Sequence, residues 1–248
     1  MQATKNKLAK FGQVLFYSLS YRGFARRSLF QLYNSIIIAE GKIPACPINQ
    51  LVAGAPDIEL RLFESPVEGN ASGFEIACLC ALVRDLRPAV VLEIGTFNGN
   101  TTLQLAANTP LATRIYTLDL PWDTRTSPKV AAGDIAFISS EKRKELRFTS
   151  TDQESKIKCL YGDSLSVSFS DLLEGRKADF IFVDAGHSYD CVRNDSEKSF
   201  SVLNKGGVIV WHDYGASWPG VYKYLNELSK RKKLRNIEGT ELVVYIDN

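Results

Sequence analysis

The sequence of 248 residues lacks the marks of disulfide-linked, zinc-binding and nucleic-acid-binding proteins. Its five cysteines are odd in number and form no C-x-x-C pair, so they indicate neither a disulfide framework nor a zinc knuckle. This cysteine usage favours a reducing compartment, and we expect a cytoplasmic protein. With 30 basic and 28 acidic residues, the net charge of +2 does not indicate a polyanion-binding protein, so nucleic acid is not an expected partner.

The basic N-terminus lacks a long hydrophobic run. Six lysines and arginines precede the first acid, Glu40, and the apolar run at residues 14–19 is too short to span a membrane. We expect residues 1–60 to form a helical arm and a linker, and residues 61–248 to form the main domain. Such an arm would pack on its own domain or on the other subunit of a homodimer. The alternative is peripheral contact with a membrane surface.

Short apolar segments that end in acids alternate with helical segments along the main domain. After an irregular connection at residues 41–56, the pattern predicts a helix over 74–83 and strands at 90–94, 114–120, 157–163, 179–184 and 207–213. Near-continuous apolar strands separated by helices indicate a parallel sheet covered on both faces, a doubly wound α/β fold. Residues 234–246 predict an antiparallel hairpin at one sheet edge, with a turn at Gly239. Ligands in such sheets bind outside the carboxyl ends of the strands.

The first of these strands leads into a glycine turn that is typical of nucleotide binding. The turn, Gly95-Thr-Phe-Asn-Gly99, lacks the middle glycine of the G-x-G-x-x-G fingerprint that closes on a pyrophosphate. An acid just before it, Glu93, would repel a diphosphate and attract a cationic amino or sulfonium group. Asp119 lies 119 − 95 = 24 residues beyond the first glycine, at the end of the next strand, where a carboxylate can accept both ribose hydroxyls. The sequence therefore predicts a nucleoside ligand without phosphates.

From about Pro88 onward the chain resembles the class I S-adenosylmethionine (SAM)-dependent methyltransferases. Four motifs in the family's order support this: Val-Leu-Glu93-Ile-Gly95-Thr-Phe-Asn-Gly99, Tyr-Thr-Leu-Asp119, Tyr-Gly-Asp163-Ser and Phe-Ile-Phe-Val-Asp184-Ala-Gly-His187-Ser-Tyr. The resemblance implies a Rossmann-like, seven-stranded sheet with one antiparallel strand. It also implies that the methionine part of SAM is surrounded by Glu93, Gly95, Phe97, Gly99 and Thr101, the ribose by Asp119, and the adenine edge by Asp163 and Ser164.

Both histidines of the chain follow the fourth and fifth strands, in Asp184-Ala-Gly-His187 and in Trp-His212-Asp213-Tyr214. This pattern resembles small-molecule methyltransferases related to the metal-dependent catechol and macrolide-sugar O-methyltransferases. In the catechol enzymes the corresponding acids bind Mg²⁺, and the third position after the first acid carries a lysine base. The resemblance thus implies Mg²⁺ at Asp184 and Asp213. His187 stands at the position of that lysine, and an imidazole there suits the role of base, with His212 in reserve. The alternative is that either histidine is merely structural.

This chain departs from the catechol pattern in having Tyr214 in place of Asn after the second acid. Without a metal, Asp184 would hold the substrate or the SAM amino group. Asp213 would then cap a helix or bond His212.

Together these features predict a SAM-dependent methyltransferase that acts on a small molecule, with a hydroxyl as the favoured acceptor and with or without a metal. The alternatives are a nucleoside-binding module without catalysis, an NAD-dependent oxidoreductase and an aminopropyltransferase that uses decarboxylated SAM. A polar insert at residues 121–153, which includes Trp122 and a predicted helix over 134–146, would form a lid over the ligand or a plain surface helix.

Overall fold

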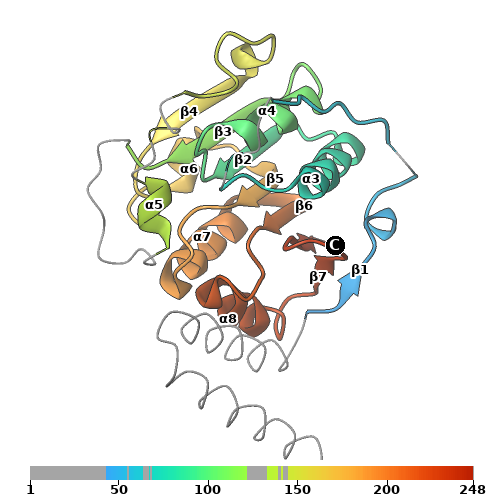
Figure 1. Cartoon of the computed structure of the whole chain (residues 1–248), viewed down its shortest axis with the longest axis vertical. Coiled ribbons are helices and arrows are strands. Elements are labelled where there is room, and N and C mark those ends of the chain that lie inside the picture. The colour runs from blue at the N-terminus through green and yellow to red at the C-terminus, as the bar shows by residue number, and fades with distance from the viewer. Residues whose placement is uncertain are drawn as a thin grey trace, which may run out of the picture.

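An eight-stranded sheet forms the centre of the computed structural model, with the strand order β1-β7-β8-β6-β5-β2-β3-β4 (Figure 1). The five predicted strands are all present and are paired in parallel: β2 (Val90–Ile94), β3 (Arg114–Asp119), β4 (Ile157–Tyr161), β5 (Ala178–Val183) and β6 (Leu203–Trp211). Strand β8 (Val243–Ile246) runs antiparallel to both β6 and β7 (Leu234–Ile237). The predicted doubly wound, mostly parallel Rossmann-like sheet is therefore confirmed.

The structure describes residues 43–54, 56–63, 67, 69–121, 133–138, 141 and 145–247. The predicted helical arm at residues 1–40 lies outside this part of the chain, together with the homodimer or membrane contact predicted for it. Trp122 and other parts of the predicted insert also lie outside it. Within the described ranges, no helix is long and apolar enough to cross a membrane.

One edge of the sheet differs from the prediction in two ways. The C-terminal hairpin is present, but β8 lies between β6 and β7, and β7 pairs on its other side with β1 (Ala45–Cys46). The sheet therefore has eight strands, not seven, and its edge is β1. The short strand is held by backbone bonds from Asn236 to Pro44 (3.0 Å) and from Glu238 to Cys46 (2.9 Å). Two residues carry no periodic pattern, so the segment resembles an irregular connection in the sequence.

Helices cover both faces of the sheet. In Figure 1, α3 (Gly73–Leu86) and α4 (Asn100–Ala107) lie toward the top and right, and α7 (Tyr189–Val202) and α8 (Pro219–Leu228) toward the bottom. Successive strand residues point to opposite faces. Thus Leu92 and Ile94 of β2 join the core against α7, α8 and the short α6 (Phe169–Leu172), while Val91 joins the core against α3 and α4.

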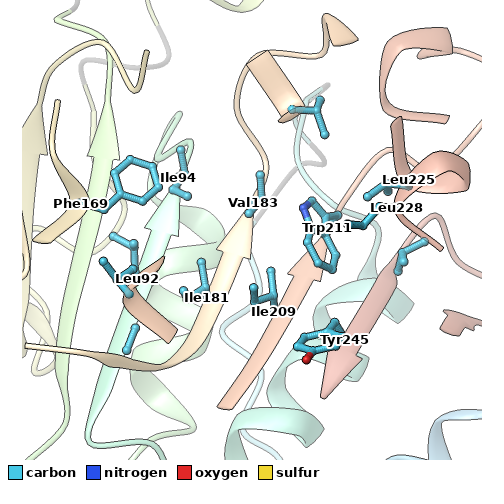
Figure 2. Close-up of a cluster of buried hydrophobic side chains, with 14 of the residues drawn as sticks. Leu92, Ile94, Phe169, Ile181, Val183, Ile209, Trp211, Leu225, Leu228 and Tyr245 are labelled. Atoms are coloured by element: carbon cyan, nitrogen blue, oxygen red, sulfur yellow. The ribbon is translucent and has the colours of Figure 1, made fainter. Parts of the chain in front are cut away.

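The core against α7 and α8 is built from large side chains on adjacent strands. Figure 2 shows Trp211 of β6 packed close to Leu225 and Leu228 of α8, with Ile209 beside it on the same strand. The indole Nε1 donates to Ser196 Oγ at 2.9 Å, so its polar atom is satisfied although the ring is buried. Full burial of an aliphatic side chain such as Ile209 or Leu225 stabilises the fold by roughly 1.5–3 kcal/mol.

Helix α3 begins with a reciprocal cap that also ties it to the C-terminal hairpin. Ser72 Oγ accepts from the Glu75 amide (3.3 Å), and Glu75 Oε2 accepts from the Ser72 amide (2.8 Å). The second carboxylate oxygen, Oε1, accepts from the amide of Glu241 in the β7–β8 connection (2.9 Å). Glu75 is consequently a buried acid that is fixed by two separate segments.

The glycine turn after β2 requires its first glycine for close packing. Gly95 has φ +106°, and its amide donates to Leu118 O at 2.8 Å. A Cβ atom at this position would lie 1.8 Å from the backbone oxygen of Asp184, which follows β5. The ends of β2 and β5 can approach this closely because residue 95 has no side chain.

We predict that Gly95→Ala is far more destabilising than Gly175→Ala, its matched control. Gly175 has a similarly positive φ of +76°, but a Cβ added there would have nothing within 4 Å, so alanine incurs only the left-handed backbone cost. That cost is about 1–2 kcal/mol. The clash with Asp184 should lower the free energy of unfolding by about 3 kcal/mol or more beyond it. Urea unfolding and soluble yield would measure this, and equal stability of the two variants would contradict the predicted clash.

Candidate active site

A cavity of about 310 Å³ opens at the carboxyl ends of β2 to β6. Most of the predicted site residues line it: Gly95, Phe97, Thr101, Asp119, Asp163, Ser164, Asp184, His187 and Asp213. The structure therefore brings together residues from five strand ends, as expected for a parallel sheet. The volume falls within the usual range for a small-molecule site.

Asp119 holds the glycine turn in place at the cavity wall. Its Oδ2 accepts from the Phe97 amide and its Oδ1 from the Leu120 amide, both at 2.7 Å. The Phe97 ring meets the ring of Phe137 edge-on, with centroids 6.1 Å apart. The carboxylate is thus fixed by backbone donors while it faces the cavity, and a carboxylate oxygen can accept more than one hydrogen bond, as binding of a ligand hydroxyl requires.

The loop after β4 is anchored to helix α7. Asp163 Oδ1 accepts from the Leu165 amide at 2.9 Å. The backbone oxygen of Ser164 accepts from Asn194 Nδ2 (3.0 Å) and from Lys198 Nζ (2.5 Å). These bonds present Asp163 and Ser164 to the cavity on a fixed backbone.

Two predicted residues, Glu93 and Gly99, are not part of the cavity wall. Glu93 is fully buried on the α4 side of β2, where its Oε2 accepts from the hydroxyls of Thr102 and Thr117. Burial raises the pKa of Glu93 to about 8, so the group is mostly neutral at pH 7 and has little charge with which to attract a cationic ligand. A Cβ at Gly99 would meet the ring of Phe148, so this glycine serves packing of the turn.

His187 is held between two carboxylates. Its Nδ1 lies 2.5 Å from Asp134 Oδ1 and its Nε2 lies 2.5 Å from Asp213 Oδ2, while the ring stacks on Trp218 with centroids 3.9 Å apart. Burial opposes the charged form, but the two carboxylates outweigh it and raise the pKa of His187 to about 10. This arrangement holds the ring as a cationic imidazolium. His187 can act as the predicted base only after Nε2 has lost its proton and left Asp213.

His212, the other histidine, faces three carboxylates. Its Nδ1 lies 3.2 Å from Asp184 Oδ1 and 3.3 Å from Asp213 Oδ2, and its Nε2 lies 3.4 Å from Glu75 Oε2. Burial opposes the charged form of His212, but the surrounding acids raise its pKa. Burial likewise opposes ionisation of Glu75, but the contact with His212 and the Glu241 amide lower the pKa of Glu75 to about 2.

The residues of this cluster fit a divalent cation. Asp184, His212 and Asp213 each offer one ligand atom, and these atoms all lie within 4.8 Å of one another; the described residues contain no other such group of His, Cys, Asp and Glu. With Glu75, three carboxylates lie close to the single imidazole of His212. A cation would relieve the remaining repulsion.

The residue after Asp213, where the catechol pattern has an Asn ligand, is Tyr214, and its side chain does not replace that ligand. The Tyr214 hydroxyl accepts from the Ile43 amide and donates to Asn226 Oδ1, both at 3.0 Å, and the ring stacks on Tyr222. The third candidate ligand is instead His212, the residue before Asp213.

The site also contains residues that the sequence did not predict. Asp134 and Phe137 come from α5 (Asp134–Ile138), and Trp218 precedes α8. The helix predicted over 134–146 is thus present at its start, but the described residues 145 and 146 at its end are not helical. An acid at a helix start resembles an ordinary N-terminal helix residue, so only its position in a long insert at the ligand rim could have drawn attention to Asp134. Glu75 resembles a capping residue for the same reason.

A family model matches the part of the chain that contains the central strands and the candidate site. Residues 92–214 match the sequence model of a family described as a methyltransferase domain. None of the curated proteins matches this chain. Residues 92–214 therefore carry a methyltransferase domain, as predicted for a SAM-dependent methyltransferase, which sets aside the oxidoreductase alternative.

Solved structures share the fold at low sequence identity. A candidate caffeoyl-CoA O-methyltransferase from Staphylococcus aureus superposes with a TM-score of 0.54 at 16% identity, over 75% of this chain and 87% of that one. A candidate O-methyltransferase from Klebsiella pneumoniae gives 0.53 at 18%, over 87% and 96%. The O-methyltransferase TomG from Streptomyces achromogenes, solved with SAM, gives 0.50 at 17%, over 72% and 82%. At these identities the likeness establishes the fold.

We predict that Glu93→Gln removes a decrease in the free energy of unfolding that Glu93 causes as the pH rises. The folded protein keeps the proton of Glu93 up to about pH 8, whereas the ordinary pKa is 4.5, so the stability from this group is complete below pH 4.5 and is lost as the pH rises through 8. The unfolding free energy of the variant, relative to wild type, should rise by up to about 1.4 kcal/mol per pH unit in this window.

Urea unfolding at several pH values would measure this difference. Glu197→Gln, which alters an exposed acid, is the control and should run parallel to wild type. A Glu93→Gln difference that stays constant with pH would refute the buried-acid interpretation.

Proposed function

We propose that this methyltransferase transfers the methyl group of SAM to a hydroxyl of a small molecule. The main support is one cavity with fixed strand-end carboxylates at Asp119 and Asp163 and with an acid–imidazole cluster, which consists of Asp184, His187, His212 and Asp213. The first pair suits a nucleoside, and the second suits deprotonation of an acceptor. TomG, which shares the fold, is an O-methyltransferase of tomaymycin synthesis.

In this proposal SAM lies along the ends of β2, β3 and β4. Asp119 accepts the ribose hydroxyls, and Asp163 with Ser164 contacts the adenine edge. Gly95, Phe97 and Thr101 surround the methionine part, while Asp184 takes the amino group or the acceptor. Glu93 supports the turn from beneath through Thr102 and Thr117. The sulfonium would then face the cluster from the glycine turn, and holding both reactants in place supplies much of the rate.

The reaction exchanges one bond for another at the methyl carbon. The carbon–sulfur bond of SAM breaks as the carbon–oxygen bond to the acceptor forms, and S-adenosylhomocysteine leaves with the sulfur electron pair. His187 takes the hydroxyl proton on Nε2 once this nitrogen has released its own proton to solvent and left Asp213, while Asp134 keeps Nδ1–H and the ring oriented. Asp184, His212 and Asp213 would hold the divalent cation, which when bound acts as a Lewis acid toward the hydroxyl.

We expect Asp119→Ala to lower SAM affinity by about 100-fold or more, because each charged hydrogen bond contributes about 1.5–3 kcal/mol. Calorimetric titration with SAM would measure the change, and circular dichroism would show whether the fold is kept. Asp85→Ala, which removes an exposed acid of α3, is the control. Unchanged affinity in Asp119→Ala would refute the SAM site.

We expect His187→Ala to keep SAM affinity within a few-fold and to lower methyl transfer by about 100- to 10,000-fold, the usual contribution of a positioned base. Radiolabelled SAM and an extract of small metabolites would supply the assay, since label that enters any acceptor is counted. Normal transfer by the variant would show that the proton acceptor lies elsewhere.

A further inference from the structure

Glu75 is a helix-capping residue whose carboxylate also reaches the acid–imidazole cluster. Its side chain is 9% exposed, and Oε2 lies 3.4 Å from His212 Nε2. The same carboxylate accepts backbone bonds from Ser72 at the start of α3 and from Glu241 in the β7–β8 connection. Two segments that are distant in sequence therefore hold this acid against one nitrogen of the His212 ring.

The two nitrogens of His212 face opposite surroundings. Nδ1 faces Asp184 and Asp213, the two acids of the candidate cation site. Nε2 is buried, and its contact with Glu75 is longer than a good hydrogen bond. A histidine that binds a metal through one ring nitrogen almost always presents the other N–H to a carboxylate or a backbone carbonyl, which fixes the ring and its tautomer. Glu75 is the carboxylate beside Nε2, so it would accept this N–H if the contact shortened when a metal binds Nδ1.

An imidazole ligand changes which cation the site prefers. Mg²⁺ is a hard ion that takes oxygen ligands, whereas imidazole suits first-row transition metals. The Tyr214 hydroxyl is committed to Ile43 and Asn226, so it does not restore an oxygen ligand beside Asp213. Two carboxylates with one ring nitrogen form a donor set for a transition metal.

We propose that His212 binds a divalent transition-metal ion through Nδ1 together with Asp184 and Asp213, in preference to Mg²⁺, and that Glu75 is the positioning residue for the His212 ring. This inference builds on the cation site of the proposed function. It concerns metal identity and affinity, which are measurable without SAM and without an acceptor.

The first test is the preference for Co²⁺ over Mg²⁺. Metal-free protein is titrated with Co²⁺, followed by its visible absorption, and Mg²⁺ is then added as competitor. His212→Asn, which replaces the ring nitrogen by an amide, should reduce the ratio of Co²⁺ to Mg²⁺ affinity by at least about tenfold. An equal ratio in wild type and variant, or no Co²⁺ binding by wild type, would overturn the proposal.

The second test isolates Glu75. Glu75→Gln retains a residue that suits the helix cap, yet it should weaken Co²⁺ binding by about 10- to 100-fold in wild type and have little further effect in His212→Asn. Ser72→Ala, the matched control, removes the other half of the cap and should lower stability while it leaves Co²⁺ affinity unchanged. Equal weakening by Glu75→Gln in both backgrounds would show that Glu75 does not act through His212.

These results are separable from the proposed function. Loss of SAM binding or of methyl transfer would sink the function without altering the Co²⁺ and Mg²⁺ affinities. Conversely, tighter binding of Mg²⁺ than of Co²⁺ would overturn this inference and leave the SAM site intact.

Discussion

The site depends on the parallel backbone ladder, which continues one residue past the ends of the central strands. The Asp184 amide donates to Ile94 O (2.8 Å), the His212 amide to Val183 O (3.1 Å) and the Gly95 amide to Leu118 O (2.8 Å). These bonds fix the residues after β2, β5 and β6 side by side, and this close approach is available only because residue 95 has no Cβ. A single backbone constraint therefore places the glycine turn directly beside the acid–imidazole cluster.

That backbone alignment brings several carboxylates together at one rim, where they repel one another. Two imidazoles lie between them and reduce this repulsion: His187 lies between Asp134 and Asp213, and His212 lies among Asp184, Asp213 and Glu75. Each contact lowers the free energy of a charged pair in a partly buried setting, where unpaired charges would be costly. The same pairing holds His187 protonated, so it stabilises the resting cluster and opposes base chemistry until the Asp213 contact opens.

The sequence was sufficient to predict the sheet and most of the cavity wall because these depend on local patterns. Apolar runs that end in acids specify the strands, and the glycine turn with Asp119 specifies the ligand rim. Glu93 was predicted to contact the ligand but does not line the cavity. It points to the same face of β2 as Val91, toward α4, whereas the cavity lies beyond the end of the strand. Asp134 and Glu75 were not predicted, because each resembles an ordinary helix-start residue, and their contacts with His187 and His212 arise only in the folded chain.

The two halves of the cavity are consequently determined by different parts of the chain. The half at Asp119 and Asp163 is held by backbone donors next to strand ends, so the fold itself constrains it. The other half takes Asp134 and Phe137 from α5 and Trp218 from the start of α8, elements that lie over the rim and do not form part of the sheet. This half of the cavity therefore depends on contacts between separate elements, and Glu75 together with the β7–β8 connection fixes the His212 side of the cluster.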